Sequence, residues 1–332
     1  YTSQYTLSLH DALPIFLYES LGEFNLDTLK PEGVLAESWT ISGDRSTYTF
    51  ILRKDARWAD GSPVTSRDVV FTYNTIMDPD NLTGLFRTGF EQDFQDVIAV
   101  DERTVVFKAK TRRWTNFNSA LSFIVLPAHG FEGKDFNRDF NLMLPPGSGP
   151  YRLSEVKTDR YVLLKRRDDY WARELSIRKG KYTFPSIKYK FYPETAIRYE
   201  ALKKGDMDVL SVYTASYWIR FTEEAPPPQV QKNWILARKV YNYQPVGFQA
   251  FYMNLRRPMF QDIRFRKALA LLLNIDLINE KIMYDQYVPL RSFFPGYFNN
   301  DTDLPLWGFD PREARRLLAE AGIPTYDTPE RA

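Results

Sequence analysis

Residues 35–74 read LAESWTISGDRSTYTFILRKDARWADGSPVTSRDVVFTYN, and this stretch predicts a strand, a turn and a helix in close succession. Its part 47–53 (TYTFILR) alternates in side-chain character and is rich in aromatic and β-branched residues, which predicts a strand. Asp60 and Gly61 follow as an Asp-Gly pair, which predicts a turn. The stretch therefore indicates a fold in which strands and helices are mixed.

The helix signal in this stretch is a capping box. Thr65 is followed three residues later by Asp68, and apolar residues then recur at Val69, Val70 and Tyr73. Asp78 precedes a proline, which disfavours a helical backbone at that position. We therefore predict a helix that begins after Thr65 and ends at Asp78.

The rest of the chain also mixes the two kinds of element, without the regular alternation of a doubly wound sheet. Strands are predicted at 104–110, 151–156, 161–165, 206–212, 236–243 and 248–254. Helices are predicted at 194–204, 263–274 and 311–321. Residues 145–150 (PPGSGP) predict a loop at which the chain crosses between domains.

Composition excludes several classes of function. The 332 residues suffice for two or three domains, and the net charge of +2 gives no general attraction to nucleic acid. The sequence contains no cysteine, which excludes thiolate catalysis and Cys-ligated metal. The two histidines, His10 and His129, lie in no recognisable motif. We therefore expect no metal, no cofactor and no nucleic-acid partner.

Neither end of the sequence resembles the end of a natural exported chain. Residues 8–15 (SLHDALPI) resemble translated sequencing-adaptor DNA, and no signal peptide can be recognised before residue 16. We therefore expect residues 1–15 to be a loosely held, non-native leader, with a genuine short leader as the alternative. Residues 328–332 (TPERA) follow a helix signal without a closing element, so we expect a truncated C-terminus.

Residues 35–74 resemble the signature region of the family 5 extracellular solute-binding proteins, the oligopeptide, dipeptide and nickel binders of ABC importers. The similarity joins LAESW at 35–39, FILRK at 50–54, WADG at 58–61 and PVT at 63–65. Further landmarks are GSGPYRL at 147–153, DYW at 169–171, ALKKGDMD at 201–208 and NLRRPMFQDIRFRKA at 254–268. Residues 247–260 and 284–294 resemble the subgroup that imports larger oligopeptides and microcin C. We expect the signature residues themselves to be structural.

The resemblance implies the mixed α/β, two-lobe fold of periplasmic binding proteins (type II) with an extra subdomain, which buries its ligand between the lobes. Lobe one would comprise residues 16–40 and 147–250, and an inserted subdomain would comprise residues 41–146. Lobe two would be residues 251–332 and incomplete. The family further implies a monomer without enzymatic activity that delivers peptides to the permease subunits of an ABC transporter. It would act in the periplasm or be lipid-anchored outside the cytoplasmic membrane.

The resemblance places two segments in the ligand cleft. An extended peptide in such a cleft is held largely through backbone hydrogen bonds. We expect Glu19 to meet a ligand amine and Asn254 a peptide amide; the alternatives are a carboxylate at a surface strand end and a turn residue bonded to its own backbone. The predicted ligand-binding residues are Tyr18, Glu19, Ser20, Leu21, Tyr252 and Asn254.

Two other functions stay open. The same fold can bind an oligosaccharide or another small solute, with Trp218 and Trp234 as stacking platforms, whereas scarce histidines disfavour free nickel. A glycosidase-like enzyme would need two carboxylates across an aromatic cleft. Asp206 and Asp208 are close in sequence, but we expect them to cap and solvate the turn that follows the helix at 194–204.

Overall fold

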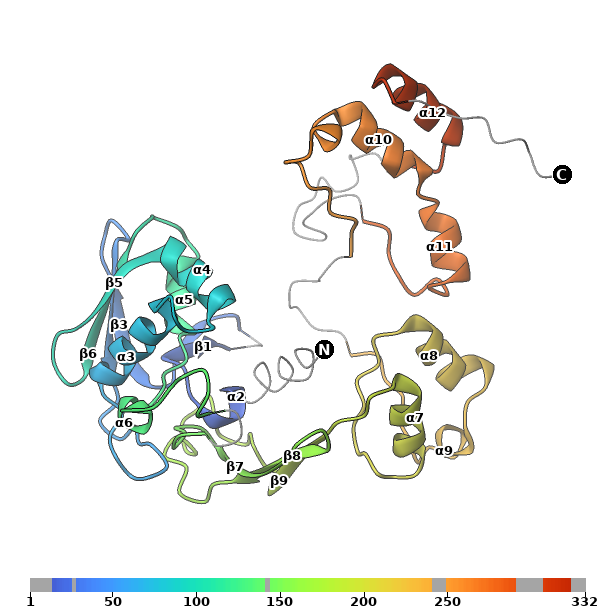
Figure 1. Cartoon of the computed structure of the whole chain (residues 1–332). Helices are drawn as coiled ribbons and strands as arrows, with labels where there is room; N and C mark the ends of the chain where they lie inside the picture. The colour runs from blue at the N-terminus through green and yellow to red at the C-terminus, as the bar shows by residue number, and fades with distance from the viewer. Residues whose placement is uncertain (1–13, 26–27, 141–143, 241–248, 291–306, 324–332) are drawn as a thin grey trace. The chain divides into compact units, whose positions relative to one another are not determined.

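The computed structural model describes residues 14–25, 28–140, 144–240, 249–290 and 307–323. The chain divides into two compact units, Tyr1–Pro193 and Glu194–Ala332 (Figure 1). The mixed α and β order expected from the sequence is confirmed. The division falls inside residues 147–250, so the finer division into lobes and subdomain stays a prediction. Residues 1–13 of the predicted leader lie outside the described residues.

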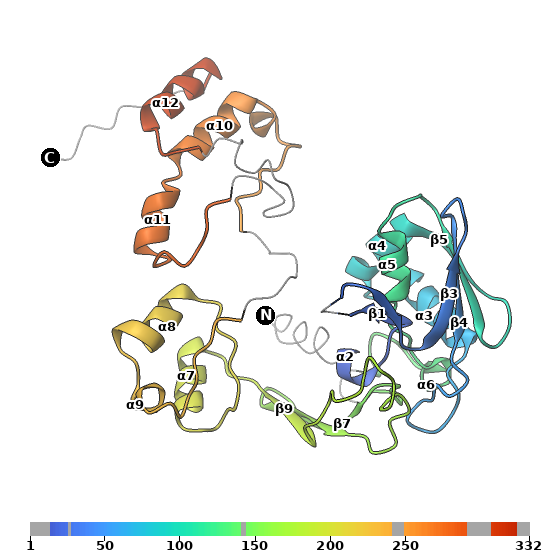
Figure 2. The ribbon, with the colours of Figure 1, turned by 180° about the vertical axis from the view of Figure 1, so that it is seen from behind.

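The first unit contains a four-stranded antiparallel sheet in the order β3-β4-β6-β5. Helices α3, α4 and α5 lie on one face of this sheet (Figures 1 and 2). The strands predicted at 47–53 and 104–110 are confirmed as β4 and β6, and the predicted helix is α3. The bounds are β3 (Ala36–Ile41), β4 (Thr47–Leu52), β5 (Phe94–Ala99), β6 (Thr104–Ala109), α3 (Ser66–Met77), α4 (Gly84–Asp93) and α5 (Asn116–Leu121).

The core of this unit follows from the alternation in β4. Successive side chains of a strand point to opposite faces, and every second side chain of β4 is buried: Tyr48, Phe50 and Leu52. Phe107 of β6 is fully buried beside them. Its ring meets the rings of Phe50, Phe94 and Phe123 edge-on, with centroids 5.7, 5.3 and 5.5 Å away. This geometry is favourable between aromatic rings, so Phe107 joins two strands to the segment after α5.

Helix α3 begins at the capping box that its sequence predicts. Asp68 Oδ2 accepts hydrogen bonds from the Thr65 backbone N–H at 2.8 Å and from Thr65 Oγ1 at 3.0 Å. Its other oxygen, Oδ1, accepts from the backbone N–H of Ala128 at 2.9 Å, at the start of α6 (Ala128–Phe131). The side chain is buried. One carboxylate therefore caps α3 and fixes a second helix against it.

Replacing Asp68 with alanine is expected to lower the free energy of unfolding by about 1–2 kcal/mol, because the cap of α3 and the bond to the half-buried Ala128 N–H are lost together. Urea unfolding followed by far-UV circular dichroism measures this change. Arg67→Ala, at an exposed position in the same helical turn, is the matched control and should change stability far less. Equal losses in the two variants would contradict the capping role of Asp68.

A second sheet follows in the same unit. Strands β7 (Tyr151–Lys157), β8 (Tyr161–Arg166) and β9 (Ser186–Lys190) pair in this order, all antiparallel. The first two confirm the strands predicted at 151–156 and 161–165. A short hairpin of β1 (Gly22–Phe24) and β2 (Pro31–Gly33) and the short helix α2 (Pro14–Leu17) complete the described elements of this unit.

The predicted loop at 145–150 is where the N-terminal segment meets the rest of the first unit. The Gly149 N–H donates to Leu17 O at 2.9 Å, and the Glu19 N–H donates to Ser148 Oγ at 2.8 Å. A Cβ on Gly147 would lie 2.0 Å from Leu17 O, a distance that no side chain tolerates. Glycine is therefore required here by close backbone approach.

The second unit is largely helical in its described residues. Helices α10 and α12 bury a small cluster between them, formed by Ala268, Leu271, Ala314 and Leu317. The helices predicted at 194–204, 263–274 and 311–321 are confirmed as α7, α10 and α12. The elements are α7 (Thr195–Lys203), α8 (Ala215–Ile219), η1 (Arg220–Glu224), α9 (Pro228–Gln231), η2 (Pro258–Phe260), α10 (Ile263–Leu272), α11 (Ile275–Lys281) and α12 (Pro311–Glu320).

Three strand predictions in the second unit are wrong for the residues that the structure describes. Residues 206–212, 236–240 and 249–254 form no strand, while residues 241–248 lie outside the described part. A strand needs a neighbour to accept its backbone hydrogen bonds. Among the described residues of this unit no strand pairing occurs, so their local β propensity is not realised.

Candidate functional site

Residues 18–21, predicted to face a ligand, are packed into the first unit. Tyr18, Glu19 and Leu21 are buried, with Leu21 fully inaccessible. Tyr18 donates its hydroxyl to Pro145 O at 3.0 Å, and half-buried Ser20 donates Oγ to Gly22 O at 2.9 Å. The polar side chains of this segment are thus already engaged within the unit.

Glu19 lies in a buried ion pair. Arg178 Nη2 lies 2.6 Å from Glu19 Oε2, and Arg178 Nε donates to Glu19 Oε1 at 3.2 Å, so the guanidinium binds the carboxylate with two parallel hydrogen bonds. The hydroxyl of Tyr170 donates to Glu19 Oε1 as well. Both side chains of the ion pair are only 3% exposed. Such a pair is geometrically specific and excludes water.

A second carboxylate extends the network toward the surface. Glu23 Oε1 accepts from Arg178 Nη1 at 2.6 Å, and Lys181 Nζ lies 3.5 Å from the same oxygen. The Glu23 side chain is 33% exposed, so this end of the network reaches solvent. Arg178 therefore joins the buried Glu19 to a partly exposed pair.

Burial and the neighbouring charges shift the pKa values of Glu19 and Arg178 in opposite directions. Burial raises the pKa of the Glu19 carboxyl, and the Arg178 charge with the hydrogen bonds from Arg178 and Tyr170 opposes this rise. Burial would lower the pKa of Arg178, but the charge of Glu19 and the hydrogen bonds to Glu19 and Glu23 raise it above its ordinary value. The two-point contact favours the ionised pair at neutral pH.

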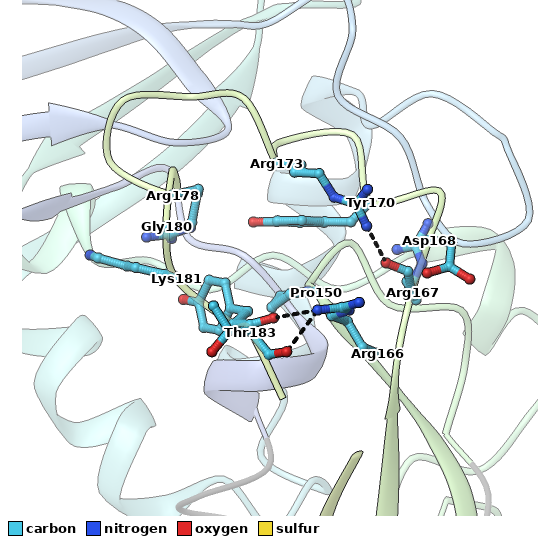
Figure 3. A pocket seen from close by; sticks show the side chains of 11 residues that line it. Pro150, Arg166, Arg167, Asp168, Tyr170, Arg173, Arg178, Gly180, Lys181 and Thr183 are labelled. Atoms are coloured by element: carbon cyan, nitrogen blue, oxygen red, sulfur yellow. Dashed lines mark hydrogen bonds between the residues drawn. The ribbon is translucent and has the colours of Figure 1, made fainter. Parts of the chain in front are cut away.

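A pocket of about 340 Å³ opens beside this network (Figure 3). It lies between the end of β8 and the loop that runs from residue 167 to residue 183. Figure 3 shows Tyr170, Arg166, Arg173 and Arg178 around it. Its wall is formed by Pro150, Arg166, Arg167, Asp168, Tyr170, Arg173, Arg178, Gly180, Lys181, Tyr182 and Thr183.

The second predicted segment lies in the second unit and is exposed. The Tyr252 side chain is 76% exposed. Asn254 is exposed, and its Oδ1 accepts from the backbone N–H of Arg256 at 3.1 Å. This bond, two residues along the chain, forms the local turn that was the structural alternative for Asn254. Among the described residues, the Asn254 amide nitrogen makes no hydrogen bond.

No signal in the sequence marks Arg178 or Tyr170 as partners of Glu19. Tyr170 was recognised as part of the DYW landmark, but Arg178 belongs to no recognisable motif. Arg178 lies 159 residues from Glu19 along the chain, and no local pattern can signal a contact at that separation. The one hint was composition, since a carboxylate in an apolar stretch such as FLYESL requires a cation if it is buried.

Two other side-chain groups weighed from the sequence lie outside the pocket. His129 Nε2 lies 2.7 Å from Asp60 Oδ2, and both side chains are more than one third exposed. Asp206 and Asp208 are exposed beyond the end of α7, which matches a solvated turn. Among the residues that the structure describes, no three His, Asp or Glu side chains are grouped as a metal site.

A comparison with protein families identifies the chain. The model described as bacterial extracellular solute-binding proteins, family 5 Middle, matches residues 30–331. The chain belongs to this family. The match contains the residues 35–74 on which the resemblance was first based.

The relatives of this family-5 chain are longer than the chain itself. A probable peptide-binding protein of Agrobacterium fabrum, YejA, is 31% identical over 282 residues, which are 82% of this chain and 45% of that protein. NikA from Brucella suis in complex with Fe(III)-EDTA has a TM-score of 0.71 at 23% identity, covering 95% of this chain and 60% of NikA. Haemophilus influenzae OppA in complex with RPPGFSPFR has a TM-score of 0.69 at 24% identity, covering 93% of this chain and 62% of OppA. This chain therefore shares the mixed α/β fold of these family-5 binding proteins and spans less than two thirds of their length.

The family landmarks hold the fold in this structure. Trp58 of the WADG motif is only 1% exposed, and the Ala59 N–H donates to Gly147 O at 2.9 Å. Arg53 donates Nε to Val34 O at 2.8 Å. The expectation that the signature is structural agrees with these contacts. In the described part of the chain no helix is both long and apolar enough to cross a membrane.

Proposed function

We propose that this protein is the solute-binding component of an ABC importer, which captures peptides or peptide-like compounds outside the cytoplasmic membrane and delivers them to the permease subunits. The observation that carries the proposal is the family-5 match over residues 30–331, together with a relative named for peptide binding. The OppA structure, which has a similar fold, holds the peptide RPPGFSPFR. The proposed role is binding by a monomer, without catalysis.

The two predicted segments differ in what they offer to a solute. Tyr18, Glu19 and Leu21 are covered by their own unit and bound to it, so they leave little surface for a ligand. Tyr252 and Asn254 are exposed, and the Asn254 amide is a suitable donor to a peptide carbonyl. We therefore assign direct solute contact to Tyr252 and Asn254, and a positioning role to residues 18–21.

A second candidate is a solute of another class. NikA in its structure holds Fe(III)-EDTA, so a similar fold accommodates a metal chelate. An oligosaccharide would use aromatic platforms; Trp234 is 72% exposed, although Lys232 Nζ lies 4.9 Å from its ring centroid. Peptides are preferred here because the YejA relative, which is 31% identical over 82% of this chain, is named as a probable peptide-binding protein.

Calorimetry on the protein expressed from its complete gene tests the proposal. Titration with a mixture of short peptides should give saturable heat, and oligosaccharides should give none. Asn254→Ala should weaken peptide affinity by about 0.5–1.5 kcal/mol, the value of one hydrogen bond, with unchanged thermal unfolding. Saturable binding of an oligosaccharide or a metal chelate without peptide binding would overturn the assignment.

A further inference from the structure

The pocket beside the Glu19 network has an excess of positive charge in its wall. Its lining contains a single acidic side chain, Asp168. The volume of about 340 Å³ lies at the small end of ligand pockets, which suits a compact ligand. The basic lining residues are Arg166, Arg167, Arg173, Arg178 and Lys181.

Three of these five cations are held by carboxylates of the protein. Arg167 Nε donates to Asp169 at 3.2 Å, and its Nη1 donates to the carbonyl oxygens of Gly147 and Gly149. Arg178 is bound by Glu19 and Glu23, and Lys181 lies near Glu23, as described above. These three side chains therefore form the wall rather than a receptor for a further anion.

The other two cations, Arg166 and Arg173, have no carboxylate within 4.0 Å among the described residues. Arg166 Nη1 donates to Thr183 O at 2.8 Å and to Tyr182 O at 3.5 Å. Its Nε is buried and has no acceptor in the described part of the chain. The Nη2 of Arg173 makes only a long hydrogen bond, 3.5 Å, to Arg167 O. Because neither guanidinium is neutralised by a carboxylate of the described residues, both keep a positive charge and further N–H donors for an anion that enters the pocket.

The turn that closes the pocket is strained. Tyr182 has a φ of 58°, in the left-handed region that a bulky side chain rarely adopts, and Gly180 two residues earlier has a φ of 78°. The Arg178 guanidinium lies 5.8 Å from the centre of the Tyr182 ring. A non-glycine residue in this conformation is strained, and such residues are concentrated at ligand and active sites. The turn presents the Tyr182 and Thr183 carbonyls that hold Arg166 at the pocket.

We propose that this pocket binds a small oxyanion, a carboxylate or a phosphoryl group, through Arg166 and Arg173. The planar guanidinium offers paired N–H donors whose spacing matches the two oxygens of such groups. Asp168 and the carboxylates that hold the other cations keep the net charge of the region low, so the site selects a small anion rather than a polyanion. The site lies wholly within the first unit and does not depend on the transport role.

Isothermal titration of the whole 332-residue chain at low ionic strength tests the proposal. Inorganic phosphate and acetate are titrated separately, which distinguishes a phosphoryl from a carboxylate ligand. At least one anion should bind saturably. Arg173→Gln and Arg166→Gln should each weaken that binding about tenfold or more, because a charge-assisted hydrogen bond is lost.

Two variants keep the test decisive. Arg173→Gln loses only one long hydrogen bond, so its thermal unfolding should match the wild type even if Arg166→Gln disturbs the turn. Arg112→Gln removes an arginine that is 71% exposed and outside the pocket wall, and it should bind the anion as the wild type does. The proposal is overturned if neither anion binds saturably, if Arg173→Gln binds unchanged, or if Arg112→Gln weakens binding equally.

Discussion

Replacing Arg178 with methionine is expected to lower the free energy of unfolding by about 3–5 kcal/mol, because the substitution leaves a buried carboxylate without its cation. Glu19 would lose both hydrogen bonds from the guanidinium, and only the Tyr170 hydroxyl would remain in contact with it. Methionine fills much of the same volume, so the loss reports charge rather than a cavity. Urea unfolding of the 332-residue chain measures the change.

The loss of unfolding free energy caused by Arg178→Met should depend on pH. Burial already raises the pKa of Glu19, and removing the neighbouring positive charge raises it further. A carboxyl whose folded-state pKa lies above its unfolded value contributes most stability below the unfolded value, and this contribution is lost as the pH rises through the folded pKa. The variant should therefore be least stable, relative to wild type, at neutral pH. The difference should shrink as the pH falls toward the unfolded value of 4.5.

Two controls separate the ion pair from general effects. Arg112→Met removes an exposed arginine whose partner Asp44 lies 3.5 Å away, and it should cost at most about 1 kcal/mol. Glu19→Gln combined with Arg178→Met removes both charges, so it should be less destabilised than the sum of the single variants. Additive single losses, or a deficit independent of pH, would contradict an ionised Glu19–Arg178 pair.

Replacing Phe107 with alanine is expected to cost a similar amount, about 3–5 kcal/mol, through the cavity left in the core. The ring is fully buried and meets three other aromatic rings, from β4, from the start of β5 and from the segment after α5. All four rings belong to the first unit, and the sheet that carries Phe107 cannot easily collapse around the gap. Thermal unfolding followed by near-UV circular dichroism should show a lower transition temperature and weaker aromatic signals.

Phe86→Ala is the matched control for Phe107→Ala. Phe86 lies on α4 in the same unit, and its side chain is 65% exposed. The substitution removes the same atoms without leaving a cavity, so stability should change by less than about 0.5 kcal/mol. If the two alanine variants lost equal stability, Phe107 would not occupy the core position that the structure assigns to it.

Local elements could be predicted where the signal was contained within a few residues. The alternation in TYTFILR gave β4, because a strand places every second side chain on one face. Thr65 and Asp68 predicted the start of α3, because a capping box needs only two residues three apart. The helix predicted at 311–321 is α12, whose N-cap residue Asp310 accepts at Oδ1 from the N–H groups of Arg312 and Glu313.

The strand predictions in the second unit show where local signals are insufficient. Residues 206–212 and 236–240 carry the expected residue types, yet neither stretch is a strand. A strand is stabilised by a neighbouring strand, and propensity alone does not say whether one is present. A helix such as α10 satisfies its own backbone, which is why the helices of this unit were predicted more successfully.

The sequence by itself determined the family and the local elements of the first unit, because motifs such as WADG and the capping box are contained in short stretches. Tertiary structure decided which partners the candidate residues have. Glu19 was predicted to meet a ligand, and the fold instead supplies Arg178 as its partner from 159 residues away. The strength of an ion pair depends on the distance between the two charges and on their removal from water. Neither quantity is set by position along the chain, so only the folded structure could establish this pair.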